Sequence, residues 1–77
     1  MRFIDVGAGN IVSEERIICV AAADSAPIRR IIQDSRDRSM LVDCCAGRKC
    51  RSVIVTDSDH VIASSMEVDE IKAGLAK

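Results

Sequence analysis

The sequence is almost free of aromatic residues. Phe3 is the only aromatic side chain among 77 residues, and Trp and Tyr are absent. Proteins that bind single-stranded nucleic acid stack the bases on aromatic side chains, and each stacked base contributes about 1–3 kcal/mol. This chain lacks the residues for such a stacking platform. Any nucleic acid that it binds should therefore be double-stranded.

Long apolar runs are missing as well. No span approaches the roughly 20 apolar residues that a membrane helix needs, and residues 1–5 lack the apolar run and cleavage site of a signal peptide. We therefore expect a cytoplasmic protein, in which thiols stay reduced. There is no Cys-x-x-Cys pair and His60 is the only histidine, so no metal site is indicated. The expected role of the cysteines is that of small buried apolar residues: Cys19, Cys44, Cys45 and Cys50.

The chain is short enough to form one domain, residues 1–77. A domain of this size buries only about 60% of the surface that it exposes when unfolded. Apolar residues make up 48% of the sequence, which is enough for a hydrophobic core and argues against disorder. Small domains with thin cores often gain stability from disulfides, metals or subunit contacts, and of these we favour subunit contacts.

The charges are distributed unevenly along the chain. Residues 27–52 carry seven basic and three acidic side chains, a net charge of +4, whereas residues 1–26 carry −2 and residues 53–77 carry −3. The total is −1, which by itself does not favour nucleic acid. A positive centre between acidic ends can nevertheless direct a polyanion to one face of a protein.

The apolar pattern predicts a mixed α and β protein. Asp24 or Ser25 is a good N-cap, Pro27 suits the first turn, and the apolar spacing continues to about Arg38, so a central helix is expected there. Strands joined by short turns pair antiparallel. We therefore expect an α+β fold, with a mostly antiparallel sheet, the central helix packed on it and a short C-terminal helix. The expected strands are residues 2–6, 16–22, 40–44, 50–56 and 60–63, and the last helix is residues 67–77.

Three cations lie close together near the expected turn between residues 40–44 and 50–56. Arg48, Lys49 and Arg51 fall within four residues and would stand at the tip of a hairpin. Arg and Lys supply most protein contacts to DNA phosphates, and Arg can also read guanine. The alternative is a solvated turn, because charged residues are common on turns in any case. Spacing alone does not separate the two interpretations.

Other clusters are better explained by structure than by chemistry. We interpret the cations of the central helix as residues that keep the protein soluble and form local ion pairs. Residues 57–60 contain two Asp, a Ser and a His, but Asp and Ser are the ordinary residues of a turn between strands. Arg16 is interpreted as a structural residue or a subunit contact. Because we find no set of nucleophile, base and orienting group, we expect no enzymatic activity, no cofactor and no bound metal.

Four segments of the chain resemble a known family. They read Phe-Ile-Asp-Val-Gly-x-Gly-Asn (residues 3–10), Asp-Ser-Ala-Pro-Ile-Arg-Arg-Ile-Ile-Gln-Asp (24–34), Leu-Val-Asp followed by Gly-Arg-Lys-x-Arg (41–51) and Asp-Ser-Asp-His-Val-Ile-x-Ser-Ser (57–65). In this order, without sizeable gaps, they resemble the RemA family, the extracellular matrix regulatory proteins of Gram-positive bacteria. The match covers nearly the whole chain, so it is more specific than any single motif.

The resemblance implies a sequence-selective DNA-binding transcription regulator that acts on biofilm-matrix genes. It also implies a ring-like homo-oligomer whose subunits resemble DNA-binding domains of the LytTR type. By motif match, the DNA-contacting basic pair of the family falls on Arg48 and Lys49, with Arg51 close by. Arg16 occupies another position that the family ties to function, so it is a further candidate for DNA contact beside Arg48, Lys49 and Arg51.

The chain departs from the family pattern at its cysteines. The family usually has Ala-Thr before the glycine-arginine turn and Thr after it, whereas this chain has Cys44, Cys45 and Cys50. Without the threonine hydroxyls, the chain lacks their hydrogen bonds to phosphate or backbone. Its preferred DNA sequence can therefore differ from that of the family. A redox-sensing role for these thiols stays open.

We therefore expect two partners, double-stranded DNA and further copies of the chain, and neither a membrane nor a small-molecule substrate. In this hypothesis the basic turn repeats around an oligomer, so that many weak phosphate contacts add up on one DNA. The alternative is a protein-interaction scaffold whose basic turn docks an acidic partner, and a steep salt dependence would favour DNA over it. A third option, a thiolate metal site, predicts zinc in the purified protein.

Overall fold

The fold is built from two sheets and two α-helices. The computed structural model describes residues 2–75. A short 3-10 turn, η1 (Glu14–Arg16), leads into the third strand. The remaining elements, in chain order, are β1 (Phe3–Gly7), β2 (Asn10–Ser13), β3 (Ile17–Ala22), α1 (Ala26–Asp37), β4 (Leu41–Cys44), β5 (Ser52–Thr56), β6 (Val61–Ser64) and α2 (Val68–Leu75).

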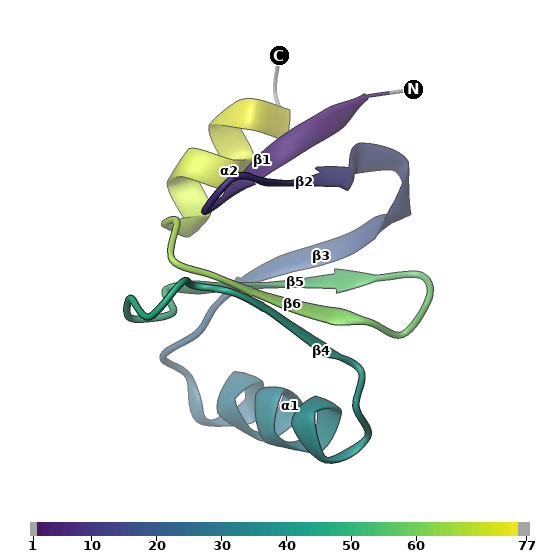
Figure 1. Ribbon diagram of the computed structural model, residues 1–77, viewed down its shortest axis with the longest axis vertical. Coiled ribbons are helices and arrows are strands. Elements are labelled where there is room, and N and C mark those ends of the chain that lie inside the picture. Colours follow the sequence, from purple (N-terminus) through teal and green to yellow (C-terminus); the bar gives the residue numbers. More distant parts are fainter. Residues whose placement is uncertain (1, 76–77) are drawn as a thin grey trace.

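The elements are arranged in three layers (Figure 1). A four-stranded sheet with the order β3-β5-β6-β4 lies in the middle. α1 packs on one face of this sheet, and a two-stranded antiparallel sheet, β1-β2, packs together with α2 on the other. The predicted α+β class is confirmed. The prediction of one sheet is wrong, because β1 and β2 pair only with each other and form a second sheet over the first.

The predicted hairpin between residues 40–44 and 50–56 is also wrong. β4 does not pair with β5 but runs parallel to β6, with Leu41 opposite Val61 and Cys44 opposite Ser64. The tight turn at residues 57–59 makes β5 and β6 the hairpin. β5 is then occupied by β3 on its other side, so the free edge of β6 is the position left for β4. Residues 45–51 therefore cross the end of β6 instead of turning back on themselves.

The core lies on both faces of the four-stranded sheet. Side chains alternate along each strand, so neighbours on β5 face opposite layers. Val53 packs towards Ile28 and Ile32 of α1, while Ile54 packs towards Ile71 of α2. Burial on both faces explains why β5 and β6 read as continuous apolar runs rather than as alternating patterns.

The central helix begins and ends where the sequence predicts. Ser25 occupies the N-cap position, Pro27 lies in the first turn, and Arg38 is the C-cap. Proline fits there because its missing N–H would have no partner inside the helix. The predicted C-terminal helix is confirmed as α2 up to Leu75, and the rest of the prediction, residues 76–77, lies outside the described residues. Within residues 2–75, neither helix has the length and apolar character needed to cross a membrane.

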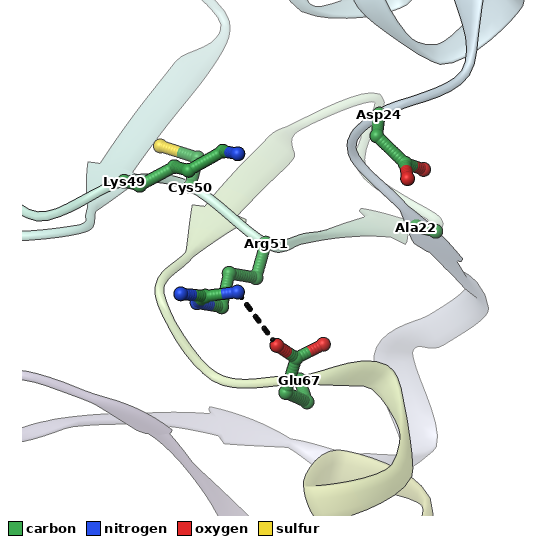
Figure 2. Close-up of a pocket in the computed structure, with 6 residues that line it drawn as sticks. All are labelled: Ala22, Asp24, Lys49, Cys50, Arg51 and Glu67. Atoms are coloured by element: carbon green, nitrogen blue, oxygen red, sulfur yellow. Dashed lines mark hydrogen bonds and ion pairs between the residues drawn. The ribbon is translucent and has the colours of Figure 1, made fainter.

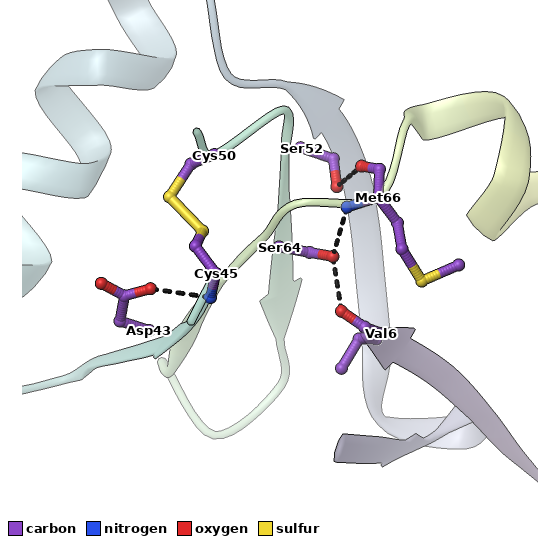
Figure 3. The surroundings of a disulfide bond; sticks show 7 residues. All are labelled: Val6, Asp43, Cys45, Cys50, Ser52, Ser64 and Met66. Carbon is purple, nitrogen blue, oxygen red and sulfur yellow. Dashed lines mark hydrogen bonds between the residues drawn. A yellow bond between two sulfur atoms is a disulfide. The ribbon is translucent and has the colours of Figure 1, made fainter. Parts of the chain in front are cut away.

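Two buried serines connect the layers. The Ser64 hydroxyl at the end of β6 donates to the Val6 carbonyl of β1 at 2.6 Å and accepts from the Met66 N–H at 3.1 Å. The Ser52 hydroxyl at the start of β5 donates to the Met66 carbonyl at 2.8 Å. Both serines are 0% exposed, and Figure 3 shows these bonds side by side. The chain between β6 and α2 is thereby tied to both sheets.

We predict that Ser64→Ala destabilises the protein by about 1–3 kcal/mol, because it leaves the buried Val6 carbonyl and the partly buried Met66 N–H without their partner. The free energy of unfolding, measured by chemical denaturation, tests this. Ser58→Ala is the control. Its hydroxyl is exposed, so water can replace its partners and the change should stay within about 0.5 kcal/mol. Equal effects of the two substitutions would contradict the assigned role of Ser64.

Candidate functional site

The candidate site is the segment of residues 45–51, here called the basic loop. It joins β4 to β5 across the end of β6. The Arg48 N–H donates to the Cys45 carbonyl at 3.0 Å and closes a turn. The two central residues of this turn, Ala46 and Gly47, have φ values of 54° and 79°. Positive φ at both positions is typical of the tightest turns and suits glycine, as the sequence indicated for Gly47.

A disulfide closes the basic loop. Cys45 and Cys50 are bonded, with their Cα atoms 5.6 Å apart, as Figure 3 shows. The expectation that all four cysteines are reduced and buried is therefore wrong for this pair. Cys44 does behave as expected, since it is free and packs in the core, whereas Cys19 is free but exposed on β3. The expectation of a reducing compartment, not the spacing of the two cysteines, argued against this pairing.

Arg48 and Lys49 are exposed on two sides of the basic loop. Arg48 borders a shallow pocket with Ala8 and Ser65, whereas Lys49 borders another with Ala22 and Asp24. None of the ion pairs found among residues 2–75 includes either cation. Both charges are therefore available to an anion from outside the subunit.

Arg51 and Arg16 are placed differently. The Arg51 guanidinium contacts the Glu67 carboxylate at 2.9 Å, at the rim of the pocket in Figure 2. Arg16 contacts Asp57 at 3.5 Å, beside the turn between β5 and β6. That turn lies at the opposite end of β5 from the basic loop (Figure 1). One subunit thus brings Arg51 next to Arg48 and Lys49 but does not bring Arg16 to them.

Ion pairs of this kind constrain the cations only weakly. Both arginines and their partners are about half exposed or more. Exposed pairs contribute about 0.2–1 kcal/mol and are screened by salt. A phosphate can therefore bind Arg51, but it must first displace Glu67 from the ion pair. At Arg48 and Lys49 a phosphate has no ion pair within residues 2–75 to displace.

The turn after β5 shows the ordinary hydrogen bonds of a turn. The Thr56 hydroxyl donates to the His60 carbonyl at 3.1 Å, and the Ser58 hydroxyl and His60 Nδ1 are 2.9 Å apart. Asp59 has a φ of 66°, which Asp tolerates in turns. The prediction of a turn at residues 57–59 is confirmed.

Asp43 is the residue near the site that the sequence did not single out. Its carboxylate accepts a hydrogen bond from the Cys45 N–H at 2.9 Å, and its oxygen lies within 4.8 Å of both sulfurs of the disulfide. A carboxylate and two thiolates can hold zinc. While the sulfurs are bonded to each other, they cannot act as thiolate ligands, so this group is not a metal centre in the oxidised protein.

Burial raises the pKa of the Cys44 thiol above its ordinary value, and the negative charge of Asp43 raises it further. The thiolate is the reactive form of cysteine. Cys44 therefore stays protonated and unreactive at a pH where an exposed thiol begins to ionise.

The geometry defines a small α+β protein that presents a disulfide-closed basic loop. A family model described as "Extracellular matrix regulatory protein A-like" matches residues 3–75. A protein of Geobacillus thermodenitrificans is 55% identical over 71 residues, which is 92% of this chain and 82% of the relative. A Clostridium botulinum protein is 49% identical over 76 residues, which is 99% of this chain and 84% of the relative. A Heliobacterium modesticaldum protein is 51% identical over 71 residues, which is 92% of this chain and 78% of the relative.

The names of these three relatives all begin "Putative regulatory protein". The family match covers almost all of the described residues, and the relatives match over most of their own length. The chain therefore belongs to the RemA-like family, as the sequence motifs predict.

We predict that iodoacetamide modifies Cys19 in the native protein and leaves Cys44 unmodified, because Cys19 is exposed whereas Cys44 is buried with a raised pKa. Mass spectrometry of the digested protein measures both sites. In urea the two cysteines should react alike, and similar rates in the native protein would contradict the burial of Cys44.

Proposed function

We propose that the protein is a transcription regulator that binds double-stranded DNA through the basic loop. The observation that carries the proposal is the pair Arg48 and Lys49, which are exposed and form no ion pair with the residues that the structure describes, 2–75. The two charges project from a short loop that a turn and a disulfide hold in shape. Membership of the RemA-like family supports a regulatory role, and we infer that the regulated genes are those of biofilm and extracellular matrix.

The lack of aromatic side chains supports a duplex as the ligand. Phe3 is the only one, and it lies on β1 rather than near the basic loop. The basic loop therefore has charge but no stacking surface. Phosphate contacts position a protein on DNA, and Arg48 is the residue suited to reach a base edge as well.

We propose that the functional unit is a homo-oligomeric ring. One subunit with a net charge of −1 and two free loop cations binds DNA weakly. Repeating the loop in each subunit multiplies these contacts on one DNA molecule, so that affinity rises without any new contact type. DNA held by many loops in a ring would also bend or wrap. The subunit would be similar to LytTR-type domains, as the family resemblance implies.

Exposed apolar side chains support self-association. Ile18 on the edge strand β3 is 65% exposed, and Ile11 on β2 is 64% exposed. Phe3 on β1 and Val42 on the edge strand β4 are also exposed. Both outer strands of the four-stranded sheet have a backbone edge that pairs with no other strand in the described part of the chain, residues 2–75. Open edges with apolar side chains are sites where proteins pair with further chains.

We predict that the double substitution Arg48→Glu with Lys49→Glu abolishes retardation of duplex DNA at low salt, because it reverses both free loop charges. Arg29→Glu with Arg36→Glu is the matched control, since it makes the same charge change on exposed residues of α1 and should retain binding. Native mass should be the same for all three proteins. If the loop variant still retards DNA, the basic loop is not the contact.

Salt dependence separates DNA binding from the alternative of an acidic protein partner. The logarithm of the DNA association constant should fall linearly with the logarithm of the salt concentration. Lys49→Ala should reduce that slope by about 1 for each loop that contacts the DNA. If Lys49→Ala leaves the slope unchanged, Lys49 does not contact a phosphate.

We predict that native mass spectrometry finds a multiple of the 8.3 kDa subunit and that Ile18→Asp shifts the mass to smaller assemblies. A charge at this edge opposes burial in a subunit contact. DNA affinity should fall with the assembly, although the basic loop is unchanged. Ile31→Asp is the control, because Ile31 is also an exposed apolar residue but lies on α1. A monomeric wild-type protein would contradict the ring.

A further inference from the structure

We propose that Cys45 and Cys50 are a reversible thiol–disulfide site that controls DNA binding by the basic loop. The bond closes around residues 46–49, which include both free loop cations. The inference rests on the proposed DNA-binding function and adds to it a chemical signal, the redox state of low-molecular-weight thiols.

The fold brings the two sulfurs together from both sides of the loop. Cys45 is 2% exposed and follows directly after β4, and its N–H donates to the Asp43 carboxylate at 2.9 Å. On the other side of the loop, the Arg51 N–H donates to the Ser64 carbonyl at 2.8 Å. Both flanks are thus held by the end of β6, since Cys44 lies opposite Ser64. These contacts involve no sulfur, so they persist when the bond is broken and favour its formation again.

The residues between the two cysteines have little else to hold them. Ala46, Gly47, Arg48 and Lys49 are all exposed, and one backbone hydrogen bond, from Arg48 to Cys45, closes their turn. Ala46 has a φ of 54°, a conformation that residues other than glycine rarely adopt. Without the disulfide, the loop has access to other conformations in which the two cations are placed differently. The disulfide therefore selects the observed shape of the loop.

The bond is open to exchange at Cys50. This residue is partly exposed and lines the same pocket as Lys49 and Arg51, as Figure 2 shows. The thiolate of a small thiol attacks Cys50 Sγ, the S–S bond breaks, and Cys45 leaves as a thiolate that takes a proton from water. A second small thiol then attacks the mixed disulfide and releases Cys50. In total, one protein disulfide and two small thiols become two protein thiols and one small disulfide.

The other two cysteines do not take part in this reaction. Cys44 is buried in the hydrophobic core, and its raised pKa keeps its thiol protonated. Cys19 lies on β3, an edge strand two positions from β6 in the sheet. Because Cys19 is exposed and separate, its substitution provides a control that removes a thiol but leaves the redox pair intact.

The experiment measures duplex DNA affinity of the whole protein after equilibration with oxidised or reduced glutathione, with EDTA present so that no metal occupies the reduced thiols. Alkylation followed by mass spectrometry records the state of the pair. If the reduced loop keeps the binding shape about one tenth of the time, the affinity of each loop falls about tenfold on reduction, and DNA held by several loops should lose at least that much. The Cys45→Ala with Cys50→Ala variant should bind like the reduced protein in both conditions, and Cys19→Ala should respond like the wild type.

Equal affinity of oxidised and reduced wild-type protein overturns the inference and leaves the proposed DNA binding intact. A response that persists in the double alanine variant also overturns it, because the signal then comes from another cysteine. Absence of binding in both states would instead contradict the proposed function itself, and the inference with it. The wild-type comparison does not depend on whether the variants fold. Native mass and circular dichroism, recorded for every sample, show whether a loss of affinity is a loss of assembly or of folding.

Discussion

The structure depends on the insertion of β6 between β5 and β4. This strand is buried on both faces, and its last residue, Ser64, lies opposite Cys44 of β4 and Ser52 of β5. The same residue bonds β1 and the segment that leads to α2. Because β4 and β5 are separated by a whole strand, the chain between them must cross the end of β6. The basic loop therefore exists as a projecting feature only because β4 pairs with β6 and not with β5.

Of the three cations in or next to the basic loop, Arg51 forms an ion pair, whereas Arg48 and Lys49 form none with the described residues. Arg51 lies beside Arg48 and Lys49 in the sequence, but Glu67 at the start of α2 neutralises it. Arg16 is likewise paired with Asp57, at the other end of the sheet. The positive centre that the sequence shows is thus divided by the fold between the basic loop and the exposed face of α1. The loop differs from α1 in that its two cations project from a short turn closed by a disulfide.

Local signals in the sequence were sufficient to predict most elements. Ser25, Pro27 and the spacing of Ile28 and Ile32 define α1, and the β-branched run at residues 53–55 defines β5. The family resemblance was also sufficient to place the chain in the RemA-like family. What the sequence could not give is pairing between distant strands, because the apolar pattern of β4 is satisfied equally by β5 or β6. The second sheet was missed for the same reason.

The candidate site shows the same division between local and distant information. Arg48 and Lys49 stand out in the sequence, and the turn chemistry of Gly47 is local. The ion pair of Arg51 with Glu67 depends on which segments the fold brings together, and residue spacing contains no such information. Cys45 and Cys50 flank the turn at Gly47 and are five positions apart, so their spacing permits a bond, and only the expected reducing compartment argued against it.

The parallel pairing of β4 with β6 also constrains the order in which the chain can fold. Leu41 and its partner Val61 are separated along the chain by the basic loop and β5, so their pairing requires the closure of a loop that spans both. Contacts between residues that are distant in the chain form slowly, because closing the large loop between them costs conformational entropy before the contacts stabilise it. Until that loop closes, β6 has an open edge and β4 lacks its partner strand.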